Sequence, residues 1–257
     1  MIDLTDYRTI PPAVGIAVRS FVDRLPNIST LTQDNPPLYD SMVRSRLENY
    51  IRPYRIPDIY NTLENILDRE EVVCYHATKV LFPANIKRKG LRTNDWERYS
   101  KDIKKALIGS GVGSAKIEET LLCLKHEKER KDFDCKNRLC FFANPISFEV
   151  EDAPGYDQFC QNVGGELAQW SLKEYMPDVY NILRDSGESV LVKFSIPFNW
   201  IADYEKESII AHFIYHEAAA YIWNYLYAIE FDGTLFQDVP ASSIIEIIRL
   251  TTLGDCK

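Results

Sequence analysis

The sequence predicts a single compact α+β domain. Short β-rich runs and longer helical runs follow one another irregularly along the 257 residues, so the strands are expected to pair mainly antiparallel. Hydrophobic residues make up 46% of the chain and aromatic residues 12%, which is enough for a large core and excludes intrinsic disorder. The sequence has no internal repeat and no low-complexity tract.

Residues 1–70 are expected to form a helical N-terminal cap over the core. In residues 38–51 most apolar side chains recur every three to five positions, as on one face of a helix. Pro57 suits the first turn of a second helix over residues 57–69. Prolines divide the region into short pieces, and they stand at positions 11, 12, 26, 36, 37 and 53.

The middle of the chain begins with a β-rich run at 71–78, which predicts the first core strand. A short helix over 83–89 follows, closed by Gly90 at the position where helix ends favour glycine. Residues 96–131 have a charged helical pattern with an interruption at 109–113. A second buried strand is expected at 138–143.

The last hundred residues start with a helical run over 157–183, broken near Gly164-Gly165 and by Pro177. The clearest strand of the chain follows at 189–196. The remaining elements are an apolar, aromatic helix and two strands joined by a turn, expected at 208–227, 228–236 and 244–250.

Charge and composition restrict the partners and the compartment. The chain carries 30 Lys and Arg against 38 Asp and Glu, a formal charge of −8, which excludes a uniformly basic nucleic-acid-binding surface but not a local basic patch. No stretch is apolar enough for a bilayer span and the start is acidic, so we expect no membrane partner and no secretory signal. The six cysteines form no Cys-x-x-Cys pair, which suits reduced thiols and a cytoplasmic protein.

A histidine and a threonine lie two residues apart in the first predicted strand, within Tyr75-His76-Ala77-Thr78. Alternate residues of a strand point to the same face, so both side chains are available to hydrogen-bond one ligand. The alternative for His76 is a core histidine bonded to backbone groups.

With the helix that ends at Gly90-Leu91, this strand resembles the first motif of the ADP-ribosyltransferase superfamily, where His-x-Thr or His-x-Ser precedes a helix ending in Gly-Leu. The apolar run 139–143, followed by Gly155-Tyr156, is similar to the second motif of that family. Residues 229–235, ahead of Val239-Pro240 and residues 244–247, are similar to its last strand pair.

The resemblance covers residues 71–250 and implies that residues 71–257 form a catalytic domain of this family, with a split, mainly antiparallel β core and inserted helices. Arginine-modifying members carry a Glu-x-Glu pair, whereas here Ala228 stands two residues before Glu230. The resemblance is therefore to the His-Tyr-Glu members, which include diphtheria-toxin-like and poly(ADP-ribose)-polymerase-like enzymes and bacterial toxins that modify nucleic acid.

The resemblance also implies roles for individual residues, with NAD as the substrate and no metal. His76 and Thr78 would anchor NAD, with His76 belonging to the catalytic set, and Tyr156 would stack on nicotinamide, with Phe142 as the second choice. Glu230 would bond the ribose 2′-hydroxyl and stabilise the oxocarbenium-like charge that develops as nicotinamide leaves.

The identity of the catalytic acid stays open between Glu230 and Glu166. Gly164-Gly165 before Glu166 allows close backbone approach at a helix N-terminus able to meet an anion, although the helix dipole alone also favours an acid there. Asp232 shares a strand face with Glu230 and is a weaker option. An ordinary hairpin with solvent-facing acids is the alternative for this segment, because Asp-Gly is a turn signal.

Three further features have plain alternatives. The basic residues 87–89 and Arg92 would suit the NAD pyrophosphate or a nucleic-acid phosphate, Arg92 best because of its forked guanidinium, or they form a solvated helix face. His212 and His216 lie one helical turn apart, but the apolar helix around them favours a core role over zinc binding. The glycines of 109–113 lack the spacing of a nucleotide-binding loop.

The expected function is transfer of ADP-ribose from NAD to a macromolecule, with release of nicotinamide, as in bacterial toxins and phage-defence effectors. By analogy the acceptor is RNA or DNA, and an antitoxin or chaperone is an expected partner. Two alternatives stay open. One is an NAD glycohydrolase or an RNA 2′-phosphotransferase on the same scaffold, and the other is a non-enzymatic interaction or sensor protein.

Overall fold

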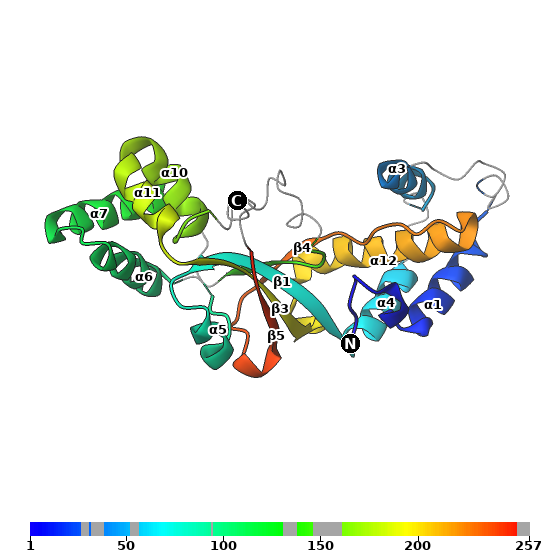
Figure 1. Cartoon of the computed structure of the whole chain (residues 1–257). Coiled ribbons are helices and arrows are strands. Elements are labelled where there is room, and N and C mark those ends of the chain that lie inside the picture. The colour runs from blue at the N-terminus through cyan, green and yellow to red at the C-terminus, as the bar shows by residue number, and fades with distance from the viewer. Residues whose placement is uncertain are drawn as a thin grey trace, which may run out of the picture. The chain divides into compact units, whose positions relative to one another are not determined.

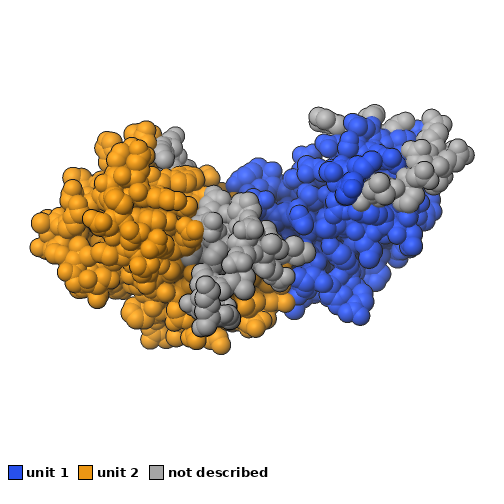
Figure 2. Space-filling model, turned by 45° about the horizontal axis from the view of Figure 1, so that its top comes forward, with its two compact units in different colours: residues 1–73, 142–144, 196–233 blue, residues 74–141, 145–195, 234–257 orange. Residues whose placement is uncertain are grey.

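The computed structural model describes residues 1–26, 31, 39–51, 57–93, 95–130, 138–145 and 161–250. These residues form an α+β structure around a five-stranded antiparallel sheet, the class that the sequence predicts (Figure 1). The chain divides into two compact units, shown in different colours in Figure 2. Unit 1 comprises residues 1–73, 142–144 and 196–233, and unit 2 comprises residues 74–141, 145–195 and 234–257.

The sheet has the strand order β4-β2-β1-β3-β5. Its strands are β1 (Glu71–Val80), β2 (Leu139–Phe142), β3 (Glu188–Pro197), β4 (Asp232–Leu235) and β5 (Ile244–Arg249). The antiparallel register of β3 and β5 runs from Val190↔Arg249 to Phe194↔Ile244, with a bulge after Lys193.

The last two strands, β4 and β5, lie at opposite edges of the sheet, so the predicted strand pair joined by a turn is wrong, and so is the hairpin alternative for this segment. The connection between them does not turn back on itself because Val239 pairs instead with Leu91 in an isolated antiparallel bridge. The two backbone hydrogen bonds of this bridge measure 2.9 and 3.0 Å. Asp232-Gly233, a turn signal in the sequence, forms the first half of β4.

Unit 1 is built from helices that pack on α12, because α1, α3 and α4 all contact it. Its helical elements are η1 (Tyr7–Thr9), α1 (Pro12–Val22), α3 (Asp40–Ile51), α4 (Pro57–Leu67), η3 (Phe198–Trp200) and α12 (Asp203–Trp223). Pro12 occupies the first turn of α1, where its missing amide proton costs no hydrogen bond. Phe21, Leu63 and Phe213 are fully buried in this unit.

Helix α12 begins five residues before the predicted start at 208 and ends four before the predicted end at 227. It ends where Asn224 takes up a left-handed conformation with φ 52°. Buried side chains lie on most of its circumference, as expected for a helix inside a packed unit. Among the described helices, none, α12 included, combines the length and apolar composition that a membrane-spanning segment requires.

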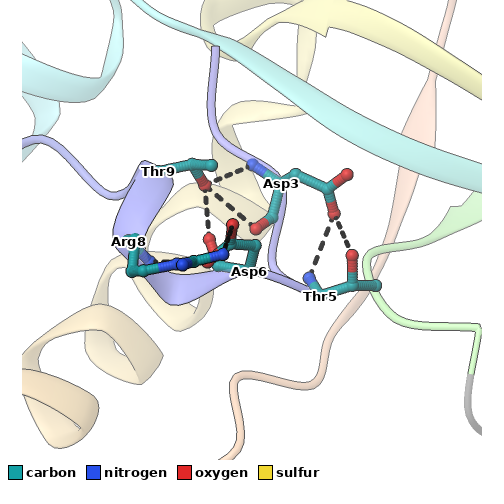
Figure 3. Close-up of polar contacts among 5 residues, drawn as sticks. All are labelled: Asp3, Thr5, Asp6, Arg8 and Thr9. Atoms are coloured by element: carbon teal, nitrogen blue, oxygen red, sulfur yellow. Dashed lines mark hydrogen bonds and ion pairs between the residues drawn. The ribbon is translucent and has the colours of Figure 1, made fainter.

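The first residues of the chain are tied to the start of β1 and to one another. Ile2 forms a parallel bridge with β1, through backbone hydrogen bonds of 2.7 and 2.8 Å. Figure 3 shows the polar contacts that follow: the Thr9 hydroxyl accepts a hydrogen bond from the Asp3 amide (2.8 Å), and Arg8 pairs with Asp6 (2.7 Å). This pairing lowers the pKa of the Asp6 carboxyl below its ordinary value.

Unit 2 contains most of the residues of the sheet, together with a cluster of helices and one short helix. The helices are α5 (Ala84–Lys89), α6 (Trp96–Gly109), α7 (Ser114–Arg130), α10 (Gly165–Tyr175), α11 (Pro177–Asp185) and η4 (Ala241–Ser243). Apolar side chains of α6, α7, α10 and α11 form one core, with Leu107, Leu124, Leu172 and Leu183 fully buried. Gly164 before α10 has φ 106°, and a Cβ there would lie 2.7 Å from Ile103 Cδ1.

Helix α5 ends at Gly90, as predicted from the position of this glycine. The φ of Gly90 is 75°, and its amide donates a hydrogen bond to the Ile86 carbonyl at the helix end. A Cβ at this position would lie 1.9 Å from the Val239 carbonyl oxygen, so the close approach of two backbones also requires glycine. The next residue, Leu91, then forms its bridge with Val239.

Candidate functional site

His76 and Thr78 lie on β1, the strand in which the sequence places them. Both side chains are half-buried, whereas their neighbours in the strand, Tyr75 and Ala77, are buried. Alternate residues of a strand share a face, so the histidine and the hydroxyl are presented on the same side of the sheet. Nonpolar residues dominate the rest of β1, which fixes this strand in the core.

The imidazole of His76 is held by the next strand. Its Nδ1 lies 2.8 Å from the carbonyl oxygen of Cys140 in β2. A carbonyl only accepts, so Nδ1 carries the hydrogen and, in the neutral ring, Nε2 is left as an acceptor. Burial lowers the pKa of His76, and the hydrogen bond to Cys140 offsets this only in part. The geometry thus favours a neutral imidazole able to accept a hydrogen bond from a hydroxyl.

Glu230 and Phe142 approach the same end of β2. Phe142 is the last residue of β2 and is half-buried. The amide of the following residue, Ala143, donates a hydrogen bond of 2.9 Å to the carbonyl of Phe231. Glu230 directly precedes Phe231 and is exposed, two residues ahead of β4. The predicted strand over 228–236 is therefore shorter at its start, and Glu230 stands in the chain segment that leads into it.

The strand order makes β4, β2 and β1 consecutive, and each of the three carries or follows a predicted site segment. Strand β2 is the common neighbour, since Cys140 contacts His76 and Ala143 contacts Phe231. The sequence does not reveal this order, because these segments are far apart along the chain and strand pairing depends on tertiary contacts.

Glu166 stands apart from these strands in the chain, in the first turn of α10. Helix α10 packs through Leu167 and Leu172 into the helical core of unit 2. Burial raises the pKa of the Glu166 carboxyl. The preceding Gly164 is explained by packing, since the Tyr99 hydroxyl donates to its carbonyl at 3.1 Å and Ile103 fills the space where a side chain would stand.

Arg92 is engaged with Asp238. The guanidinium Nη1 donates to Oδ2 of Asp238 at 2.7 Å, and Oδ1 of the same carboxylate accepts hydrogen bonds from the Thr93 amide (2.8 Å) and hydroxyl (3.1 Å). Partial burial raises the pKa of Asp238, but these hydrogen bonds outweigh it and leave the pKa lowered. Arg92 is about half exposed, so the rest of its donor fork faces solvent. Tyr156, the predicted nicotinamide-stacking residue, lies outside the described residues.

The two histidines of α12 have structural partners. His216 Nδ1 bonds the carbonyl of Tyr227, and His212 Nδ1 lies 3.1 Å from the hydroxyl of the same tyrosine. Burial lowers the pKa of His212 to about 4. In the part of the chain that the structure describes, no cluster of three or more His, Cys, Asp and Glu side chains is arranged to hold a metal ion.

A cavity of about 710 Å³ lies among α3, α4 and α12 of unit 1, and sequence reasoning gave no sign of it. Its lining includes His212 and Lys206, and the Lys206 ammonium lies within 4 Å of Asp203, Glu64 and Asp68. Burial lowers the pKa of Lys206, but the three carboxylates raise it overall. The cavity contains none of the residues predicted for NAD binding.

The described residues of the predicted site are His76 and Thr78 on β1 in unit 2, and Phe142 at the end of β2 with Glu230 ahead of β4 in unit 1. The imidazole and hydroxyl of the first pair can hydrogen-bond hydroxyl groups, and the second pair offers a flat ring and a carboxylate. The chain matches no protein-family model, no curated protein and no solved structure.

Proposed function

We propose that this protein is an NAD-dependent ADP-ribosyltransferase. In the reaction the bond between ribose C1′ and the nicotinamide nitrogen breaks, and nicotinamide leaves with the bonding electron pair as a neutral molecule. A nucleophile of the acceptor macromolecule forms the new bond to C1′ and loses its proton to solvent or to a nearby base. No oxidation or reduction takes place, and no metal is required.

The observation that carries the proposal is the consecutive order of β1, β2 and β4. Three short segments, each of which resembles a motif of one NAD site, fall on or beside these neighbouring strands, whereas β5, the second strand of the expected last pair, lies at the other edge of the sheet. His76 would accept a hydrogen bond from an NAD hydroxyl through Nε2, the nitrogen left as acceptor by the contact with Cys140. Thr78, on the same strand face, would supply a second hydroxyl contact.

Glu230 is the preferred catalytic carboxylate. The bond between Ala143 and Phe231 ties its segment to the end of β2, beside Phe142. Its role would be to stabilise the positive charge that builds up on the ribose as nicotinamide departs, which requires a charged carboxylate. Glu166 is the second choice, because it stands in the first turn of α10, a helix of the helical core, and not on or beside β1, β2 or β4.

The first test is nicotinamide release from NAD by the purified full-length protein, alone and with cell RNA, DNA or protein extract. Release that rises with one extract, together with label transferred from NAD to that material, supports transfer and identifies the acceptor class. Release of free ADP-ribose in every case indicates a glycohydrolase, and phosphate moved from RNA to NAD indicates a 2′-phosphotransferase. No turnover and no NAD binding by calorimetry would sink the proposal and favour an interaction protein.

Substitution of the carboxylates tests the site. Glu230→Gln is expected to lower the rate of nicotinamide release by about 100–1,000-fold while leaving NAD binding in place, because it removes charge stabilisation from the transition state. Asp232→Asn, two residues on and equally exposed, is the matched control and is expected to keep its rate. If Glu166→Gln rather than Glu230→Gln abolishes release, the catalytic role passes to Glu166.

A further inference from the structure

Unit 2 carries a concentration of positive charge on α5 and α6. Residues 79–105 contain nine Lys and Arg against three Asp and Glu, in a chain whose formal charge is −8. All these basic residues except Lys79 are exposed. Within the part of the chain that the structure describes, Lys87, Lys89, Lys101 and Lys104 have no ion pair, so their charges are not neutralised by neighbouring acids.

The basic side chains of α6 form a row. Arg98, Lys101 and Lys105 stand at positions i, i+3 and i+7, so they share one face of the helix, on which Asp102 also stands and pairs with Lys105 at 3.6 Å. The opposite face is buried and carries Ile103 and Leu107. At 1.5 Å per residue the row is about 10 Å long, enough to reach two or three phosphates of one strand.

Arg98, at the N-terminal end of this row, is held by ion pairs. Asp238 accepts from Arg92 at 2.7 Å and lies 3.9 Å from Arg98, so one carboxylate holds two guanidinium groups together. Arg98 also pairs with Asp95 at 3.4 Å, so two guanidinium groups and two carboxylates meet here, and the guanidinium donors that these pairs do not use suit a phosphate.

The other end of the row opens into a hollow in which apolar side chains are exposed. Phe82 is 60% exposed and Ile108 is 56% exposed, and both line this hollow together with Lys105 and Gly109. A Cβ at Gly109 would meet nothing within 4 Å, so a flat group can approach the rim of the hollow closely. An exposed phenylalanine next to a lysine is a platform on which a nucleobase stacks.

We propose that the face of α6 from Arg98 to Lys105, with Phe82 at its end, binds single-stranded nucleic acid. The phosphates would follow the row of cations, and one unpaired base would stack on Phe82. A duplex fits less well, because its paired bases are stacked on one another and their flat faces are closed. The proposal names the acceptor class of the transferase reaction and in that respect rests on the proposed function, but strand binding itself requires no NAD.

Fluorescence anisotropy of a labelled strand of about 12 nucleotides, as DNA and as RNA, tests the surface against the duplex of the same sequence. Tighter binding of either single strand than of the duplex is expected. The double substitution Lys101→Glu with Lys105→Glu is expected to weaken binding at least about tenfold and to flatten its salt dependence, since fewer counterions are released. Phe82→Ala is expected to weaken binding by about 5–100-fold without changing the salt dependence.

The matched control is Lys125→Glu with Lys173→Glu, the same change of charge at exposed positions on α7 and α10. Equal weakening by this control, equal binding of the duplex, or stronger binding of anionic lipid vesicles than of the strands would each overturn the proposal. Strand binding without nicotinamide release sinks the transferase proposal alone, and release without strand binding sinks the nucleic-acid surface alone.

Discussion

His212 is a buried imidazole whose protonation opposes folding. Its ring is only 9% exposed and bonds the Tyr227 hydroxyl, with Tyr215 beside it. Burial and the nearby Arg44 lower its pKa to about 4. In the unfolded chain the pKa returns to about 6.5, so below that pH the unfolded state binds the proton first and acid weakens the fold.

This residue gives a measurable dependence of stability on pH. A shift from 6.5 to about 4 predicts that the free energy of unfolding falls by roughly 2 kcal/mol between pH 7.5 and pH 5.0 on account of His212. His212→Asn keeps a polar group near the Tyr227 hydroxyl and removes the titration, so most of this fall is expected to disappear. Urea unfolding at the two pH values measures it, and exposed His126→Asn is the control.

An undiminished fall in the His212→Asn variant would show that other groups govern the acid response. His76 is one such group, because its pKa is lowered in the same direction and its contribution has the same sign.

The residues of the candidate site illustrate what single positions in a sequence can reveal. The pairing of His76 and Thr78 on one strand face was predictable, because the period of a strand is fixed at two residues. The contact of His76 with Cys140 was not, because it depends on which strand lies beside β1. The partner of Arg92, Asp238, was equally hidden, since no local pattern links residues so far apart in the chain.

At the scale of elements, the end of α5 depends on Gly90. Gly90→Ala places a methyl group against the Val239 carbonyl and forces an alanine to φ 75°, so the bridge between Leu91 and Val239 must shift. The expected loss of stability is about 2–4 kcal/mol, from backbone strain and steric overlap together. Gly109→Ala is the matched control, because a Cβ there meets nothing within 4 Å.

Thermal or urea unfolding of the two variants measures the difference. Equal stability of Gly90→Ala and Gly109→Ala would contradict the close approach of the two backbones at Gly90.

Sequence patterns located most elements but not their arrangement. Helices α5, α6, α10 and α11 and strands β1, β2 and β3 were predicted within a few residues in the described regions, because caps, glycines, Pro177 and apolar periodicity act locally. The separation of β4 from β5 was missed, since a short connection usually signals a hairpin. The true bounds of α12 were also missed, because a helix that is apolar on most sides has no periodicity to mark its ends.

At the scale of the whole molecule, the unit boundaries fall within strands. β1, β2, β3 and β4 each contribute residues to both units, so neither unit has a complete set of strands of its own. Unfolding is therefore expected to be one cooperative transition, in which far-ultraviolet circular dichroism and tryptophan fluorescence change together.

Core truncations in each unit test this expectation. Phe21→Ala in unit 1 and Leu107→Ala in unit 2 remove fully buried side chains, and each is expected to lower stability by about 2–5 kcal/mol. Both are expected to move the same single transition. Two separate transitions, each shifted by only one of the variants, would mean that the units unfold independently.

The composition of unit 1 from three separate stretches of chain has a consequence for the protein as it is made. Helices α1 and α4 belong to the first 73 residues, but α12, on which they pack, comes from residues 203–223. At translation rates of about 5–20 residues per second, the nascent chain grows for roughly 7–30 s between the end of the first stretch and the end of α12. During that time the apolar faces of α1 and α4, which include Phe21 and Leu63, have been synthesised but cannot yet pack on α12.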